Sequence, residues 1–241
     1  MVTANSNDQL IQALGADLTP VRRLTSPNVR ALGWLAIVGT VALALAAVSD
    51  VGAMSRRLMA APDMWLAASG SLVTAVLAAL AAFQLSLPDR QPAWALLSLP
   101  AAVLWIGASG IGCLRSWIVP GTHPASLEES ETCLTFILGL SVPLSVLLIV
   151  MLRQGYSLRP NLTSVIGGLA CAAAAATLLN FIHPYDATAT DLAVHAFAVA
   201  IVIYANSLFA GRFLVSKNMP FVGVTGSRSI EVPISSHRRD M

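Results

Sequence analysis

The stretch Gly112–Cys133, GCLRSWIVPGTHPASLEESETC, is the only long polar interruption in the middle of an otherwise apolar chain. It holds Cys113 and Cys133 near its two ends and one basic residue, Arg115. Its other ionisable side chains are His123, Glu128, Glu129 and Glu131. An acidic loop that is flanked by cysteines and lies between two long apolar runs indicates an outward-facing sensor or binding loop.

Composition favours an integral membrane protein. Hydrophobic residues make up 56% of the chain and charged residues 11%, whereas soluble domains contain roughly 45–50% apolar and about 25% charged residues. The bilayer is therefore expected to be the main solvent. The formal net charge of +2, without a clustered basic surface, gives no support to direct nucleic-acid binding.

The apolar segments predict the fold class. A bilayer core of about 30 Å requires about 20 apolar residues per helix. The segments that meet or nearly meet this length are Ala31–Val48, Met64–Leu87, Ala93–Gly112, Leu134–Leu152, Leu162–Ile182 and Leu192–Leu214. We predict an all-α integral membrane bundle of six transmembrane helices over residues 31–214, preceded by a short cytoplasmic amphipathic helix. Pro100 and Pro143 are expected to kink the third and fourth helices, and the small residues at 170–176 favour close helix packing.

Residues 1–30 form a predicted cytoplasmic segment that we expect to stay on the chain, because no apolar stretch follows a basic start as in a signal peptide. Asn7 or Asp8 can cap a short helix that Pro20 ends. The apolar residues of this helix fall on one stripe: Leu10, Ile11, Leu14, Leu18 and Val21. The stripe needs a partner, which is either the membrane interface or a groove on a cytosolic protein.

The basic residues predict the orientation. With both termini cytoplasmic, the inner side collects 11 of the 14 basic residues: Arg22, Arg23, Arg30, Arg90, Arg153, Arg159, Arg212, Lys217, Arg228, Arg238 and Arg239. The outer side keeps Arg56, Arg57 and Arg115. By the positive-inside rule, the acidic loop and the short loop 183–191 then face outward.

The outer loops carry two kinds of candidate chemistry. Cys113 and Cys133 lie at the outer ends of two antiparallel helices and can form a disulfide if their Cα atoms come within about 4.4–6.8 Å; alternatively, Cys113 is a small residue that packs at a helix end. Cys171 lies in mid-membrane among alanines, which indicates inert packing. An outer metal site is the other option, and its candidate ligands are Cys133, His123, His183, His195, Glu128, Glu129, Glu131, Asp186 and Asp191. His195 lies about one turn inside the last helix, with Asp191 as a candidate partner.

No catalytic motif is present: the chain has no glycine-rich phosphate loop, no GxSxG elbow and no paired intramembrane carboxylates. We therefore predict that the protein is not an enzyme and needs no cofactor. Two alternatives stay open, a small transporter or channel-like protein and a membrane thiol-redox protein that uses Cys113 and Cys133. A transporter should line a path with polar residues, and a redox enzyme should place its cysteine in an electropositive setting, whereas this loop is acidic.

Several separated motifs resemble the NrsF family of bacterial six-helix membrane proteins, which are negative regulators of an extracytoplasmic-function sigma factor. These motifs are LIQALGADLTPVRRL (10–24), LAAFQLSLPDR (80–90), GIGCLRSW (110–117), ETCLTFIL (131–138), LRPNLTSVIGGLA (158–170) and HPYD (183–186) followed by His195. The resemblance implies an anti-sigma factor of the bacterial inner membrane whose cytoplasmic N-terminal segment binds the sigma factor and whose outer face senses oxidative or metal stress. The sigma-binding candidates are then Leu10, Ile11, Leu14, Asp17, Leu18, Val21, Arg22 and Arg23.

The sequence departs from the family pattern at one position. In relatives for which thiol sensing is proposed, one cysteine matches Cys133 and another precedes the Pro-x-Asp of the last outer loop, where this chain has His183. The sensor candidates are therefore Cys133, Cys113 and His183, acting through a Cys113–Cys133 disulfide or a metal shared by Cys133 and His183. Residues 215–241 lie outside the resemblance, and their Gly, Ser and Pro content predicts a disordered cytoplasmic tail.

Overall fold

The computed structural model describes residues 8–9, 11–12, 15–16, 24–60, 62–118, 127–155, 157–182 and 189–216. Over these residues the chain is helical and contains no β-strand. The predicted all-α class is therefore confirmed.

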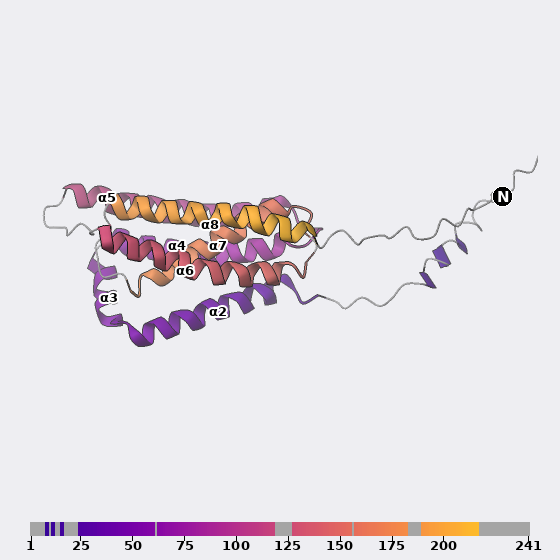
Figure 1. Ribbon diagram of the computed structural model, residues 1–241, viewed down its shortest axis with the longest axis horizontal. Coiled ribbons are helices and arrows are strands. Elements are labelled where there is room, and N and C mark those ends of the chain that lie inside the picture. The colour runs from indigo at the N-terminus through magenta and orange to yellow at the C-terminus, as the bar shows by residue number, and fades with distance from the viewer. Residues whose placement is uncertain are drawn as a thin grey trace, which may run out of the picture.

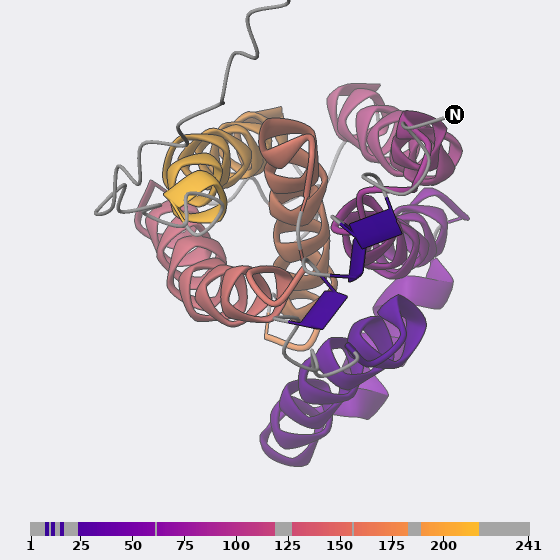
Figure 2. The ribbon, with the colours of Figure 1, turned by 90° about the vertical axis from the view of Figure 1, so that its right-hand side faces the viewer.

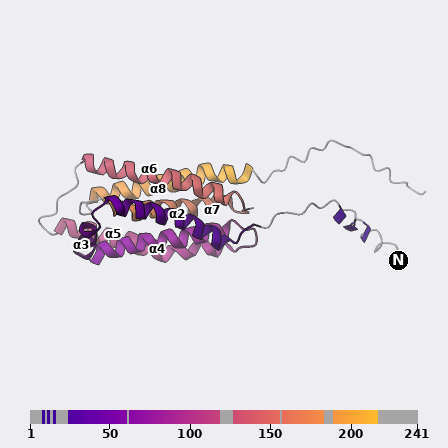
Figure 3. The ribbon, with the colours of Figure 1, turned by 90° about the horizontal axis from the view of Figure 1, so that it is seen from below.

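The long helices run up and down along one axis (Figure 1). In chain order the elements are α2 (Pro27–Val48), α3 (Val51–Ala60), α4 (Pro62–Leu85), the 3-10 helix η1 (Pro92–Ser98), α5 (Leu99–Ile118), α6 (Leu127–Leu152), α7 (Pro160–Leu179) and α8 (Ala189–Ser216). The start of α2 and the end of α8 lie at the same end of the bundle, as Figures 1 and 3 show. We call this the N-terminal end, and the end at which α3 lies the far end.

Most of the helices have the length and composition of membrane spans. In the part of the chain that the structure describes, five stretches are long and apolar enough to cross a membrane: Pro27–Val48, Pro62–Leu85, Pro92–Ile111, Leu134–Leu152 and Pro160–Leu179. Helix α8 adds a shorter apolar stretch, Ala196–Leu208. A membrane-embedded helical bundle is consistent with this arrangement.

Helix α7 occupies the centre of the bundle. It packs against α8, α4 and α6, and the view along the bundle in Figure 2 shows these helices grouped around it. Its side chains at 170–175 are almost all alanine and are essentially unexposed. In lipid, where the surrounding solvent is as apolar as the helices, small side chains let helices approach and gain dispersion contacts, so the alanine run explains why α7 is the central helix.

The structure differs from the sequence expectation at the start of α2 and at Pro100. Helix α2 begins at Pro27 rather than at Ala31, because Ser26 caps it and Pro27 suits a first helical position. Pro100 lies in the first turn of α5, after η1, so it marks a helix start, whereas Pro143 lies inside α6.

Helix α3 was not predicted. It is only ten residues long, too short to span, and it carries the pair Arg56–Arg57 that the orientation rule leaves on the outer side. Asp50 caps its start by accepting a hydrogen bond from the amide of Ala53 at 2.9 Å. Helix α3 runs across the far end of the bundle rather than along it (Figure 1).

Gly168 lies at a close approach of α7 to α8. A Cβ atom at this position would lie 2.9 Å from the Cα of Ile203 and 3.1 Å from the Cβ of Asn206. Gly168→Val should therefore lower the free energy of unfolding by about 1–3 kcal/mol, as overpacking does. Thermal unfolding in detergent micelles measures this change.

The matched control is Gly39→Ala on α2, where a Cβ would meet no atom within 4 Å. This change should stabilise the helix by about 0.5–1 kcal/mol through lost backbone freedom. An equal loss of stability in both variants would contradict the packing argument.

Candidate functional site

The N-terminal segment joins the bundle at the first turn of α2. The hydroxyl of Ser26 accepts a hydrogen bond from the amide of Val29 at 3.4 Å, which caps the helix. Leu24 lies just before this cap and is 45% exposed. Whatever residues 1–23 bind is therefore linked to the bundle through the base of α2.

Arg30 is buried at this base, with 4% of its surface exposed. Its Nη2 donates a hydrogen bond to the carbonyl of Met151, in the last turn of α6. The centre of the guanidinium lies 5.2 Å from the centroid of the Phe83 ring, on α4. The last carbonyls of a helix have no partner within the helix and carry partial negative charge, and an aromatic face attracts a cation. Together these contacts explain how an apolar bundle accommodates this charge.

Two neighbouring side chains of α2 add contacts to the same helices. The indole Nε1 of Trp34 donates to the carbonyl of Leu144 on α6 at 3.2 Å. The amide Nε2 of Gln84 on α4 donates to Oδ1 of Asn28 at 2.8 Å. Asn28, Arg30 and Trp34 thus fix the first turns of α2 to both α4 and α6.

The loop between α6 and α7 completes this end. The hydroxyls of Ser157 and Thr163 lie 3.2 and 3.3 Å from the carbonyl of Leu85, the last residue of α4, and 2.9 Å from each other. A Cβ on Gly155 would lie 2.6 Å from the carbonyl oxygen of Ser86, so only glycine allows this close approach. The loop, through Ser157, and the first turn of α7, through Thr163, therefore supply donors to a helix end that lacks partners of its own.

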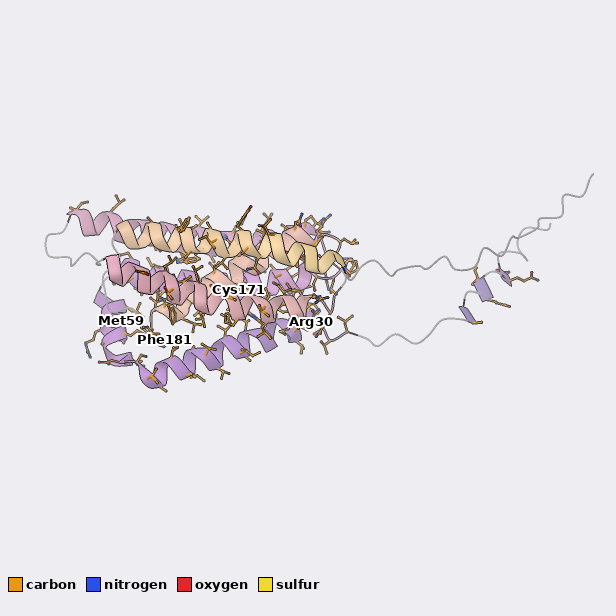
Figure 4. All side chains as sticks on the ribbon, in the orientation of Figure 1. Arg30, Met59, Cys171 and Phe181 are labelled. Atoms are coloured by element: carbon orange, nitrogen blue, oxygen red, sulfur yellow. The ribbon has the colours of Figure 1, made fainter. Side chains whose placement is uncertain are left out.

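We call this cluster the basal joint: Asn28, Arg30, Trp34, Phe83, Gln84, Leu85, Met151, Ser157 and Thr163. Within it, Nε and Nη1 of Arg30 and Oε1 of Gln84 are buried and have no hydrogen-bond partner among the described residues. Most buried polar atoms in proteins are paired, so these three atoms are exceptions among the described residues. Arg30 lies at the opposite end of the bundle from Met59 and Phe181 (Figure 4).

The sigma-binding candidates lie almost entirely outside the described residues. Ile11 is the exception: it is in helical conformation and 66% exposed. Leu10, Leu14, Asp17, Leu18, Val21, Arg22 and Arg23 are not described.

The sensor candidates are described only in part. Cys113 belongs to α5 and Cys133 to the first turns of α6, but their side chains, and all of His183, lie outside the described residues, as do the side chains of His195 and Asp191. Helix α6 packs against α7, α8 and α2, whereas α5 packs against α4, η1 and α8.

Cys171 is a free cysteine with no exposed surface, in the middle of α7. The prediction that it is buried in the bundle is confirmed. No group of three or more His, Cys, Asp or Glu residues lies together within the ranges that the structure describes.

Sequence reasoning missed the basal joint. Arg30 was counted only among the basic residues of the inner side, and its partners are on other helices, with 121 positions between Arg30 and Met151. The one available signal was indirect: Phe83, Gln84 and Leu85 belong to LAAFQLSLPDR, and Thr163 to LRPNLTSVIGGLA. The motifs alone do not show that these residues meet at one end of the bundle.

Comparison with known proteins gives one match. A family model described as NrsF, negative regulator of sigma F, matches residues 14–215. No curated protein and no solved structure matches the chain. The matched region includes the second half of the N-terminal segment, the whole basal joint and all the helices from α2 to α7.

The hydroxyls of Ser157 and Thr163 should compensate for each other. Ser157→Ala and Thr163→Val alone should each lower the free energy of unfolding by about 0.5–1.5 kcal/mol, as a lost hydrogen bond does. The double variant leaves the buried carbonyl of Leu85 without either donor and should lose roughly 0.5–3 kcal/mol beyond the sum. Unfolding of the four proteins in micelles gives this coupling energy.

Thr40→Val is the control, because the exposed Thr40 hydroxyl bonds only the carbonyl of Ala36 in its own helix, at 2.9 Å. It should change stability by less than about 0.5 kcal/mol. Strict additivity of Ser157→Ala and Thr163→Val would show that the two hydroxyls do not share the Leu85 carbonyl.

Proposed function

The chain belongs to the NrsF family of negative regulators of sigma F, and from this premise we propose that it is an anti-sigma factor of the bacterial inner membrane. It sequesters an extracytoplasmic-function sigma factor and releases it on oxidative or heavy-metal stress sensed at the outer face. The single observation that carries the proposal is the family match over residues 14–215. The mechanism is binding and release, without catalysis.

The fold supports the proposed topology. The start of α2 and the end of α8 lie at one end of the bundle, so the residues before and after it emerge on the same side. If both termini lie on that side, it is expected to collect 11 of the 14 basic residues, which favours the cytoplasm. The far end, with the ends of α5 and α7 and the start of α6, then faces outward.

The N-terminal segment is the proposed sigma-binding element. Its residues 8–9, 11–12 and 15–16 are helical, and the side chain of Ile11 is 66% exposed. A helix that exposes an apolar stripe gains free energy by placing it in a groove of a partner. Asp17, Arg22 and Arg23 provide charges beside the stripe that select the partner and its register.

The outer ends of the helices are the proposed sensor. Helix α6, which carries Cys133, packs against α7 and α8, and His183 lies in the segment that joins these two helices. Helix α5, which carries Cys113, packs against α4, η1 and α8. This arrangement favours a metal ion shared by Cys133 and His183 over a disulfide between Cys113 and Cys133. The acidic residues Glu129 and Glu131 attract a cation to the same place.

Leu14→Asp should abolish binding of the sigma factor without changing membrane insertion, since it puts a charge in the middle of the apolar stripe. Gln12→Asp is a matched control: it introduces the same charge 200° away on an ideal helix, on the polar face. Co-purification from membranes reads out binding. Recovery of equal amounts of sigma factor with both variants would remove this helix from the interface.

The sensor is tested with Cys133→Ser, Cys113→Ser, His183→Ala and Cys171→Ala in a reporter strain challenged with cadmium or peroxide. A shared metal predicts that Cys133→Ser and His183→Ala both lose the cadmium response while Cys113→Ser keeps it. A disulfide predicts that Cys113→Ser and Cys133→Ser both lose the peroxide response.

Cys171→Ala is the control and should respond normally, because a thiol buried in an apolar bundle has no access to oxidant or metal. A normal response from all four variants would rule out both sensor mechanisms.

A further inference from the structure

Helix α2 is attached to the bundle mainly at its base. Only 11% of its apolar span is buried inside the bundle, against 72% for α7. Its fully buried residues are Arg30, Ala31 and Trp34, all within the first third of the helix. The described hydrogen bonds from α2 to other helices also come from this part, through Asn28, Arg30 and Trp34.

The remainder of α2 makes weaker contacts. Val38, Val41 and Leu45 are only partly buried against the core, and Leu43 and Val48 are 74% and 83% exposed. Partly buried side chains gain fewer dispersion contacts than fully buried ones, and the described hydrogen bonds from α2 to other helices are confined to its base. The position of α2, and of the chain that enters it, is therefore set at the basal joint.

Arg30 is the central contact of this joint. A lysine could not reproduce its role, because the planar guanidinium both stacks on Phe83 and donates to Met151 from one rigid group. Yet its Nε and Nη1, together with Oε1 of Gln84, lack partners among the described residues. A buried polar cluster that is only partly satisfied is less stable than one that is complete.

We propose that Arg30 is a positioning residue for the sigma-binding segment: it pins the base of α2 between the Met151 carbonyl and the Phe83 ring, and loosening of this pin displaces the segment and releases the partner. The release step rests on the proposed function, whereas the pinning of α2 does not. Helix α2 connects the basal joint to α3 at the far end, so it is the direct covalent link between the outer face and residues 1–24.

The attachment of α2 through Arg30 is tested first by measuring the distance between two spin labels, without any sigma factor. Spin labels are placed at Leu24→Cys, just before α2, and at Leu208→Cys on α8; both positions are exposed, and α8 lies across the bundle from α2 (Figure 2). The full chain carries Cys113→Ser and Cys133→Ser and sits in bilayer nanodiscs. Pulsed electron–electron double resonance should give a narrow distribution of distances between the two labels. Arg30→Lys and Arg30→Gln should each broaden this distribution.

Two further variants make the result specific. Trp34→Phe removes the indole donor to Leu144 together with part of the buried ring, and it should also broaden the distribution. This variant serves if the Arg30 variants prove too unstable to study. Thr177→Val is the matched control: it removes a 3.0 Å hydrogen bond to Ser71 that joins α7 to α4 and not to α2. It should leave the distribution narrow. A distribution in Arg30→Gln and Trp34→Phe as narrow as in Thr177→Val would overturn the proposal.

Retention of the sigma factor is measured with the same Arg30 and Thr177 variants in the otherwise unaltered chain, without the label sites and with Cys113 and Cys133 present. Arg30→Lys should weaken retention by about fivefold or more, in the range of ordinary coupling between sites, while Thr177→Val retains it normally. Broadened distances with unchanged retention would contradict the release step. If the unaltered chain retains no sigma factor, the proposed function fails, and the distance measurement still decides whether Arg30 pins α2.

Discussion

The close approach of α7 to its neighbours is the constraint on which the rest of the bundle depends. Gly168 faces the backbone of α8 with no room for a Cβ atom, and Gly167 faces the end of the Leu148 side chain on α6. The alanines that follow keep this distance along the helix. Since lipid removes the hydrophobic force between helices, such close packing supplies much of the stabilisation. Helix α7 is consequently the central helix, against which α4, α6 and α8 pack.

Small apolar side chains let many helices pack together and so do little to specify which helices are neighbours. A few hydrogen bonds between helices add this specificity. Asn206 of α8 bonds Ser145 of α6 at 2.9 Å, and Thr177 of α7 bonds Ser71 of α4. The largest cluster is the basal joint, where helix ends expose unpaired carbonyls. The orientation of α2 depends on this cluster because α2 shares little of the central packing.

The sequence was informative wherever a local pattern has a single physical cause. Apolar runs of about 20 residues predicted the spans, because the bilayer thickness demands them, and the alanine run predicted the buried position of Cys171. Helix α3 was missed because ten residues with two arginines match no span pattern. The basal joint was missed because Arg30 meets Met151 and Phe83 only in three dimensions. Most of the predicted sigma-binding and sensor residues remain predictions, since their side chains lie outside the described residues.

The motifs that resemble the family fall mainly at the two ends of the bundle. Residues 80–90 and 158–170 build or adjoin the basal joint, and residues 110–117 and 131–138 lie where α5 ends and α6 begins. Many apolar sequences can fill the middle of a span, so the middle carries little specific information, whereas the ends require particular residues. Under the proposed function, a signal from one end to the other passes along the helices. Helix α7 is buried along most of its span, whereas α2 is buried mainly at its base, so α2 is the helix that moves in the proposed mechanism.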